Sequence, residues 1–466
     1  MDATTDRLVD FTIRATISEL SPQTVRECKR RIVDTFASAL GAFDDPLCRN
    51  ARSLAARYRA PRNATIWGSG IQAAPELAAF ANGVMLRYLD ISDTYLGHGG
   101  GHPSDVISGI VAAGEVADAN GASVINAITL AYDVYCSLMN YVDIGPKGWD
   151  QTLYAVLGCV LGVGKLMRLS HEQLANAVSL AVTPNMALRE TRQGDISGWK
   201  GCAGANAARN AVFAATLAKE GFTGPPAPFE GKQGLWNAIG RFDWILPDRN
   251  GPRLVTQTHL KSLPVCYHGQ SAVFCALELR PAVLIANIAG IHIETYRGAV
   301  AMMAGDPSRW APTTRETADH SMPYVIAIAL LDGDITVESF APARLADPAV
   351  ACLMKKVTVV EAGELTSLYP ESAPSRVHIR LISGETLSHE IRYPKGHVNN
   401  RMSDAQIDSK FRAMFGDHDD AAHCTDVLRR LWSFEKAVDI GEELLKPLAG
   451  QRFRSESADN QKAPAQ

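Results

Sequence analysis

This chain of 466 residues lacks a marked excess of either charge, since 46 Lys and Arg stand against 50 Asp and Glu. The resulting formal net charge of -4 gives no electrostatic reason to expect a nucleic acid or an anionic membrane surface as a partner. Its nine cysteines include no C-x-x-C pair, and an odd number scattered over a long chain argues against a disulfide framework. We therefore expect a protein of a reducing compartment.

Segments that would direct the chain to a membrane are also lacking. Residues 1–6 are not a basic segment followed by an apolar run, so we expect no signal peptide. No apolar run reaches the ~18 residues of a membrane-spanning helix. We therefore predict a cytoplasmic protein that has no membrane partner and binds no nucleic acid.

The residues that are present predict a mainly α fold. Hydrophobic residues make up 46% of the chain, and in its first half they recur at helical spacing, as Val25, Cys28 and Ile32 do. Strand signals begin only beyond Lys261, where residues 357–360 are β-rich and short apolar stretches alternate with polar residues. Helical patterns return after residue 403.

These patterns divide the chain into two domains. Residues 1–257 and the C-terminal helices within residues 396–450 form a large all-helical domain. A smaller α+β domain, residues 258–395, is inserted between these two parts of the chain. The remaining residues, 451–466, are polar, and we predict that they form a disordered tail.

Local signals predict how some helices begin, end and pack. Asn120 and Gly121 are typical of a helix C-terminal stop. Ser104 and Asp105 are typical of an N-terminal cap. Small residues in a later apolar helix, among them Gly158, predict that another helix approaches it closely.

The segment 88–105 is the most informative stretch because it gathers carboxylates, imidazoles and glycines between two apolar helices. Polar, glycine-rich loops on a rigid scaffold commonly carry function. Pro103 disfavours the helical conformation for His102, so His102 is predicted to stand at the N-terminus of the next helix. The partial positive charge at that place suits anionic substrates.

Three interpretations of this segment remain open. Asp90, Asp93, Thr94, His98 and His102 could form a metal site. Alternatively, a histidine acts as an acid/base group whose pKa is raised by the carboxylates, or the segment is only a hydrogen-bonded loop. The glycine spacing fits neither a Walker loop nor a dinucleotide-binding fingerprint, which argues against a phosphate cradle.

Further candidates lie at helix starts and at the change of composition. Lys200 would occupy the first turn of an alanine-rich helix, where a cation opposes the helix dipole, so it either binds an anion or is a solvated surface lysine. Lys261 and His268 lie where the helical sequence changes to the mixed sequence. Cys266, between them, is either a nucleophile or a buried cysteine. Tyr324 is either a phenolic acid or a packed aromatic residue.

Five short motifs occur along the chain. They are Asp90-Ile91-Ser92-Asp93-Thr94, His102-Pro103-Ser104-Asp105, Trp199-Lys200-Gly201, Lys261-Ser262-Leu263-Pro264 and His320-Ser321-Met322-Pro323-Tyr324-Val325. In type, order and spacing they resemble the 2-methylcitrate dehydratase / cis-aconitate decarboxylase family, the MmgE/PrpD superfamily. The resemblance covers almost the whole chain.

This resemblance implies a two-domain subunit whose smaller domain is a lid, and a homodimer. It also implies a di- or tricarboxylate substrate and no required metal or organic cofactor. The active-site positions that it carries over to this chain are Asp90, Thr94, His102, Lys200, Lys261 and Tyr324.

One position departs from the decarboxylase members of the family. Those members resemble a Gly-aromatic-His pattern at the start of a central helix, where this chain has Gly148-Trp149-Asp150. The missing imidazole argues against decarboxylation, and the aspartate resembles the dehydratase branch. Arg192 lies in a nearby segment whose guanidinium groups suit carboxylates.

We therefore predict a hydro-lyase that dehydrates a 2-hydroxy tricarboxylate, namely 2-methylcitrate to 2-methylaconitate. The alternatives are a cis-aconitate decarboxylase that forms itaconate, an epimerase or isomerase of a dicarboxylate, and a catalytically silent member of the family. The predicted catalytic residues are His102, Asp90, Lys200 and Tyr324. The predicted substrate-binding residues are Asp93, Thr94, Lys261, His268, Arg192 and Asp150.

Overall fold

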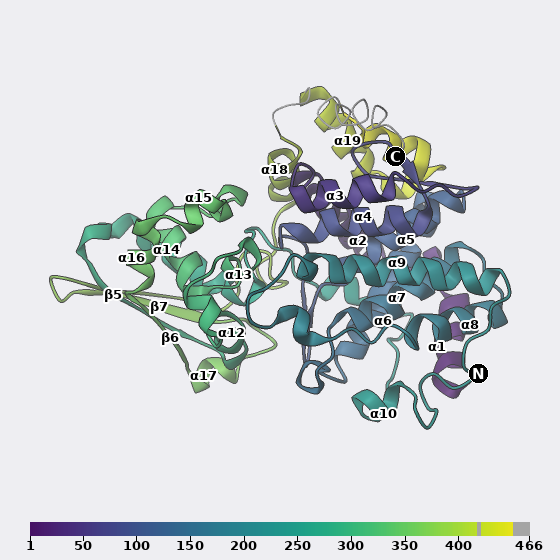
Figure 1. Ribbon diagram of the computed structural model, residues 1–466, viewed down its shortest axis with the longest axis horizontal. Helices are drawn as coiled ribbons and strands as arrows, with labels where there is room; N and C mark the ends of the chain where they lie inside the picture. The colour runs from purple at the N-terminus through teal and green to yellow at the C-terminus, as the bar shows by residue number, and fades with distance from the viewer. Residues whose placement is uncertain (417–420, 451–466) are drawn as a thin grey trace, which may run out of the picture. The chain divides into compact units, whose positions relative to one another are not determined.

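A computed structural model of the chain describes residues 1–416 and 421–450, and it is mainly helical, as predicted (Figure 1). The predicted disordered tail, residues 451–466, lies outside the described residues. The chain forms two compact units. We call them the helical unit, made of Met1–Arg189, Gly201–Thr258 and the described residues from Ser403 onward, and the mixed unit, made of Glu190–Lys200 and His259–Met402.

The helical unit is built mostly from helices that pack around α6 and α7. Both of these helices are almost entirely buried, which fits their apolar sequences. The helices are α1 Ala3–Arg14, α2 Pro22–Gly41, α3 Pro46–Ala55, α4 Pro75–Tyr88, α5 Ile107–Val116, α6 Gly121–Met139, α7 Thr152–Leu166, α8 His171–Val182, α9 Trp199–Lys219, α10 Leu235–Ile239, α18 Asp404–Phe415 and α19 Ala421–Trp432.

The prediction of an all-helical domain misses two short hairpins in the helical unit. The first pairs β1, Ala64–Thr65, with β2, Gln72–Ala73. The second pairs β3, Tyr95–Leu96, with β4, Gly100–Gly101, inside the segment that the sequence singles out. Strands this short carry no alternating pattern, so periodicity does not reveal them.

The mixed unit contains a four-stranded sheet and short helices. The strands are β5 Ile288–Thr295, β6 Val357–Glu361, β7 Ser375–Leu381 and β8 Thr386–Ile391, in the order β6-β5-β7-β8. Only β5 and β6 run parallel, and α11, Gln270–Leu279, packs on β7 and β8. The other helices are α12 Arg297–Met303, α13 Arg315–Ala318, α14 Met322–Asp332, α15 Pro342–Leu345, α16 Pro348–Met354 and α17 Gly363–Thr366.

Close packing of α7 confirms the prediction made from its small residues. A Cβ atom added to Gly158 would lie 2.6 Å from the carbonyl oxygen of Ala131 in α6. A Cβ atom on Gly162 would lie 2.7 Å from the side chain of Ile110 in α5. Glycine is therefore what lets the backbone of α7 touch its neighbours.

Two predictions of helix ends are wrong. Asn120 begins α6 instead of ending the preceding helix, since its side chain accepts the Ser123 N–H. Ser104 and Asp105 do not cap a helix, because they lie inside a 3-10 turn, Pro103–Val106, that precedes α5. Residues of these types occur at helix starts, helix ends and turns alike, so the local sequence does not reveal which of these structures forms.

The expectation that no apolar segment is long enough to span a membrane also needs correction. Among the described residues, α6 has the length and the apolar composition of a membrane-spanning helix. However, 89% of its apolar window is buried inside the protein, as in a core helix. All nine cysteines are free.

Candidate functional site

The segment between α4 and α5 holds the first group of predicted residues. It leaves α4 at Tyr88, forms the β3–β4 hairpin and enters α5 through the 3-10 turn. His98 lies exposed in the hairpin loop, whereas His102 is half-buried just after β4. The predicted metal set that joins both histidines to Asp90, Asp93 and Thr94 is therefore not assembled.

His102 is held by the backbone of its own loop. Its Nδ1 lies 2.7 Å from the carbonyl oxygen of Asp93. Because a carbonyl oxygen only accepts, Nδ1 carries the proton and Nε2 is the basic nitrogen of the neutral ring. The Thr94 hydroxyl donates to the Gly101 carbonyl at 3.1 Å and lies 3.3 Å from the same Nδ1. The His102 N–H donates to the Tyr135 hydroxyl at 2.9 Å.

The carboxylate of Asp93 is used inside the protein. One oxygen accepts the Ser104 N–H at 2.9 Å, and the other accepts the Tyr132 hydroxyl at 2.8 Å. Burial raises the pKa of Asp93, although both hydrogen bonds act in the opposite direction. Asp93 thus orients His102 through its main chain, and its carboxylate ties the loop to α6.

Asp90 depends on Arg87, a residue that the sequence analysis missed. Asp90 is buried and has a φ of +49°, a left-handed backbone that aspartate adopts more readily than most residues. The Arg87 guanidinium lies 3.1 Å from the Asp90 carboxylate and 3.2 Å from that of Asp105, and it donates to the Ser92 hydroxyl. The spacing of Arg87 and Asp90 is a signal that could have revealed this pair.

Gln151, and not the predicted residue Asp150, bonds to the loop that carries His102. The buried Asp150 carboxylate accepts the Thr152 N–H at 3.1 Å, at the start of α7. Gln151 accepts the His102 N–H at 3.3 Å and donates to Asp105 at 3.3 Å. Gln151, the neighbour of the predicted Asp150, is therefore the residue that bonds to His102.

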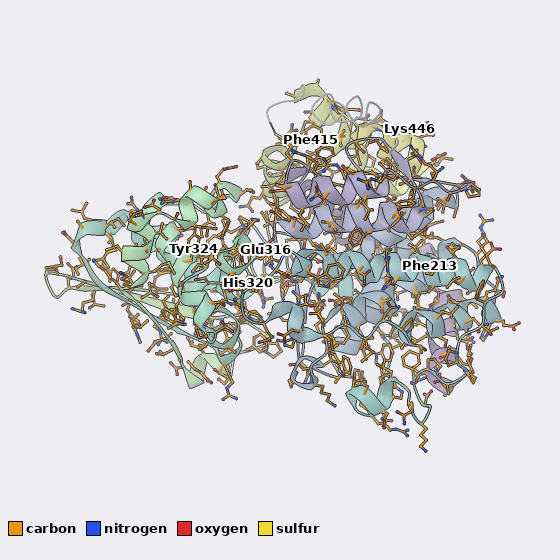
Figure 2. The ribbon with its side chains drawn as sticks, in the orientation of Figure 1. Phe213, Glu316, His320, Tyr324, Phe415 and Lys446 are labelled. Atoms are coloured by element: carbon orange, nitrogen blue, oxygen red, sulfur yellow. The ribbon has the colours of Figure 1, made fainter. Side chains whose placement is uncertain are left out.

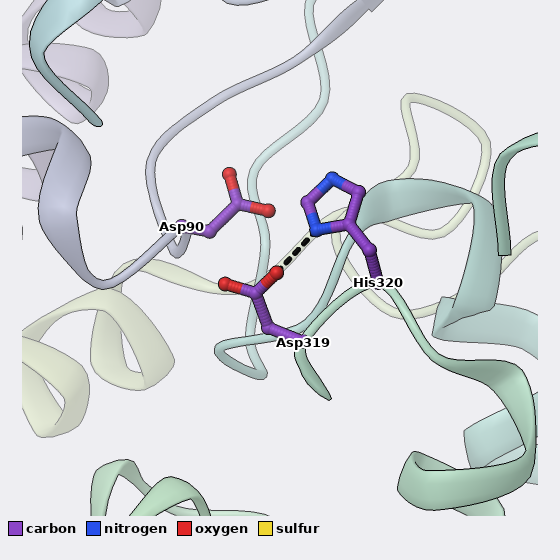
Figure 3. A group of neighbouring side chains, drawn as sticks. All are labelled: Asp90, Asp319 and His320. Carbon is purple, nitrogen blue, oxygen red and sulfur yellow. Dashed lines mark hydrogen bonds and ion pairs between the residues drawn. The ribbon is translucent and has the colours of Figure 1, made fainter. Parts of the chain in front are cut away.

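A second group of side chains lies in the mixed unit, between α13 and α14. The Asp319 carboxylate is hydrogen-bonded to Nδ1 of His320, as Figure 3 shows. Nζ of Lys200 lies 3.3 Å from the same carboxylate and 3.4 Å from His320 Nδ1. All three side chains are buried. Lys200, predicted as a catalytic residue in the first turn of α9, is thus part of an ion pair.

The surroundings of His320 favour its charged form. Burial by itself lowers the pKa of a histidine, and the charge of Lys200 acts in the same direction. The nearby Cys266 and the Asp319 carboxylate outweigh both effects, so the pKa of His320 is raised above its usual 6.5. Sequence reasoning missed His320, although the motif that singled out Tyr324 contains it.

The remaining predicted residues of the mixed unit have separate places. Lys261 is fully buried, and Arg192 lies partly exposed in a 3-10 turn, Arg189–Arg192. Nδ1 of His268 lies 2.6 Å from the Tyr296 hydroxyl.

Tyr324 is a packed aromatic residue. Its buried hydroxyl donates to the Ser339 carbonyl at 2.6 Å, and burial raises the pKa of that hydroxyl. His320 and Tyr324 are labelled in Figure 2. Lys200 therefore lies beside Asp319 and His320, whereas the Tyr324 hydroxyl is hydrogen-bonded to a backbone carbonyl.

Comparison with known proteins relates this chain to proteins of defined activity. The sequence profile of the MmgE/PrpD N-terminal domain matches residues 6–243, and that of the MmgE/PrpD C-terminal domain matches residues 263–433. A 2-methylcitrate dehydratase of Cupriavidus necator is 28% identical over 420 residues, which cover 84% of this chain and 86% of that protein. The 2-methylcitrate dehydratase of Escherichia coli K12 is 26% identical over 422 residues, with the same shares covered. The cis-aconitate decarboxylase of Homo sapiens is 24% identical over 433 residues, which cover 85% of this chain and 84% of that protein.

Proposed function

Since the chain belongs to the MmgE/PrpD family, we propose that it is a hydro-lyase that dehydrates 2-methylcitrate to 2-methylaconitate. The main support is that bacterial relatives named 2-methylcitrate dehydratase match 84% of this chain. The loop around His102 adds a chemical argument, because it presents an oriented imidazole that suits proton transfer.

Dehydration of such an acid poses a specific problem. A base removes a proton from a carbon that bears a carboxylate, and negative charge develops beside an existing negative charge. Fixed donors or cations aimed at that charge can each supply about 3–4 kcal/mol to the transition state. We assign the carboxylate anchor to the buried Lys261, on the ground of the family motif that contains it.

His102 is the base in this proposal. Its Nδ1–H donates to a backbone carbonyl that cannot itself give up a proton, so Nε2 keeps its basic lone pair. A positioned acid/base group of this kind contributes about 10²–10⁴-fold to the rate. Asp90 and Thr94 lie in the same loop, and we assign them to the substrate hydroxyl, whose proton a carboxylate or hydroxyl oxygen can accept.

Decarboxylation of cis-aconitate is the second candidate, because a human relative carries the name of that activity. The residue that argues against it is Asp150. It stands where the decarboxylase members of the family resemble a histidine, and its carboxylate accepts a backbone N–H at the start of α7. We also propose that the protein is cytoplasmic and that it forms a homodimer. Light scattering on the purified protein tests the homodimer.

The first experiment follows three acids by proton NMR. Purified protein is treated with a chelator and incubated with 2-methylcitrate, citrate and cis-aconitate. A vinylic product from 2-methylcitrate without release of carbon dioxide is the expected result. Itaconate from cis-aconitate would instead establish the decarboxylase. No change in any of the three acids would contradict both activities and direct the search to other dicarboxylates.

A further inference from the structure

The dyad of Asp319 and His320 has the geometry of an oriented acid/base histidine. Nδ1 of the ring is bonded to the carboxylate, and Figure 3 shows the second ring nitrogen on the opposite side of the ring. A carboxylate at Nδ1 fixes the tautomer and places the exchangeable proton of the charged ring on Nε2. A histidine oriented in this way suits proton transfer.

The backbone around the dyad is fixed on several sides. The Asp319 N–H donates to the Arg315 carbonyl at 3.0 Å, and the Asp319 carbonyl accepts the Cys266 N–H at 3.0 Å. The His320 N–H donates to the Thr317 carbonyl at 3.2 Å. The next residue, Ser321, caps α14. Residues held in this way keep their side chains in one geometry, as a catalytic group requires.

Lys200 controls the charge of the dyad. Its ammonium group lies 3.3 Å from the Asp319 carboxylate, and an opposite charge at this distance favours the ionised carboxylate, although the same ammonium opposes a proton on His320. The ionised carboxylate in turn stabilises a proton on His320. Together with Cys266, this carboxylate outweighs burial and Lys200, so the pKa of His320 is raised above its usual range and the charged ring is the favoured form.

We propose that His320 is a catalytic residue of this enzyme, the general acid that protonates the departing hydroxyl group, and that Asp319 is its positioning residue. This inference rests on the proposed hydro-lyase function and extends it to a residue that neither the sequence analysis nor the relatives' names assign. His320 takes the role that the sequence analysis gave to Tyr324, whose hydroxyl already donates to Ser339.

The reaction step balances without any further reactant. The base removes the proton next to the carboxylate, and the electrons of that C–H bond form the C=C bond. The C–O bond breaks with its electron pair on oxygen, and Nε2 of His320 gives its proton to that oxygen, so water leaves. The base then returns its proton through solvent to His320, and the enzyme regains its starting state.

The test compares His320→Asn and His320→Gln with the wild type and with a control, His378→Asn. His378 lies in β7, where its Nδ1 bonds to the Ser388 hydroxyl on the exposed face. We expect both His320 variants to lose about 10²–10⁴-fold in kcat with KM changed less than about threefold. We expect the control to match the wild type. Circular dichroism and thermal unfolding establish which variants are folded.

Asp319→Asn is the test of the positioning role. It keeps the size of the side chain but removes the charge that holds the proton on His320. We expect kcat to fall and the alkaline limb of its pH profile to move to lower pH, a change that a structural role does not produce. A His320 variant within threefold of wild-type kcat, or an unmoved limb in a folded Asp319→Asn protein, would overturn the inference.

Failure of the proposed function gives a different pattern. If the wild type transforms none of the three acids, the hydro-lyase proposal fails. Nitrogen NMR of the histidine rings then still tests which nitrogen of His320 carries a proton. We expect the His320 resonance to show a proton on Nδ1 and to titrate above 6.5 in the wild type, with the value lowered in Asp319→Asn. A proton on Nε2 alone would overturn the inference whatever the activity.

Discussion

A histidine oriented by a backbone carbonyl differs from one oriented by a carboxylate. The Asp93 carbonyl can only accept a hydrogen bond, so it places the proton of the neutral His102 ring on Nδ1. His320 is oriented by the Asp319 carboxylate, which also raises its affinity for a proton. In the proposed mechanism the two histidines therefore have opposite tasks, since His102 accepts a proton and His320 donates one.

His102→Asn is expected to lower kcat by about 10²–10⁴-fold while the protein stays folded, because Asn cannot replace the basic Nε2. His98→Asn is the matched control, since His98 lies exposed in the same loop four residues earlier. Steady-state kinetics and thermal unfolding of both variants measure the effect. Equal activity of the two variants would remove His102 from the mechanism.

Tyr324→Phe is expected to leave kcat within about threefold of the wild type. The variant loses one buried hydrogen bond and leaves the Ser339 carbonyl without its donor, so its free energy of unfolding should fall by about 1–3 kcal/mol. Denaturant unfolding and kinetics on the same preparation check both parts. A loss of about 100-fold in kcat with normal stability would restore Tyr324 as the proton donor.

At the scale of elements, two sets of contacts hold the core and the loop that carries His102. The first is the close approach of α6 and α7 at Gly158. The second is made by α18, near the C-terminus, whose Lys410 donates to the Ile91 carbonyl at 2.7 Å and to Asp34 at 2.5 Å. A helix from the end of the chain thereby positions the peptide between Asp90 and Asp93.

Gly158→Ala should lower the free energy of unfolding by about 1–3 kcal/mol, because its Cβ atom would meet the Ala131 carbonyl at 2.6 Å and the helices must separate. Gly363→Ala is the control, since nothing lies within 4 Å of a Cβ atom there. Denaturant unfolding measures both. Equal stability of the two variants would show that α6 and α7 pack less closely than the structure has them.

Lys410→Met should lower the free energy of unfolding by about 3–5 kcal/mol, because it leaves the buried Asp34 carboxylate without its ion-pair partner. It should also lower kcat, since the Ile91 carbonyl loses the donor that positions the loop. Lys446→Met, at an exposed pair with Glu442, should change stability by less than about 0.5 kcal/mol. A folded Lys410→Met protein with full activity would contradict the positioning role.

For the whole molecule, the dependence of stability on pH involves buried titratable groups other than His102 and His320. Burial lowers the pKa of His397 to about 4, from 6.5 in the unfolded chain. Its Nδ1 accepts the Asn399 N–H at 3.0 Å, which fits a neutral ring. Between these two pH values the unfolded chain binds a proton that the folded protein does not bind, so acid favours unfolding.

We therefore expect the wild type to lose this part of its stability as the pH falls from 6.5 to about 4. His397→Gln should flatten that loss, and His378→Asn should not. Thermal unfolding at several pH values measures the difference between each variant and the wild type. Each variant is compared with the wild type because Asp133, whose pKa burial raises to about 6, changes the stability in the opposite direction over the same pH range. Parallel curves for His397→Gln and the wild type would contradict the low pKa.

The sequence by itself determined most of what depends on neighbours along the chain. Ser21 and Pro22 begin α2, and Ser170 and Gln173 form the capping box of α8, because each cap bonds to a backbone group within three residues. Alternation predicts β5, and the turn at Gly384 joins β7 to β8. The order of the motifs was sufficient to identify the family.

Only the tertiary structure decided what each polar side chain does. Lys200 and Asp319 lie 119 positions apart, and Lys410 lies 376 positions from Asp34. No local pattern records such pairs, because a buried charge takes whichever partner the packing of the helices brings to it. For the same reason the sequence could not choose between Asp150 and Gln151, or between Tyr324 and His320. Each of these residues is a plausible chemical group, and its hydrogen-bond partner determines its role.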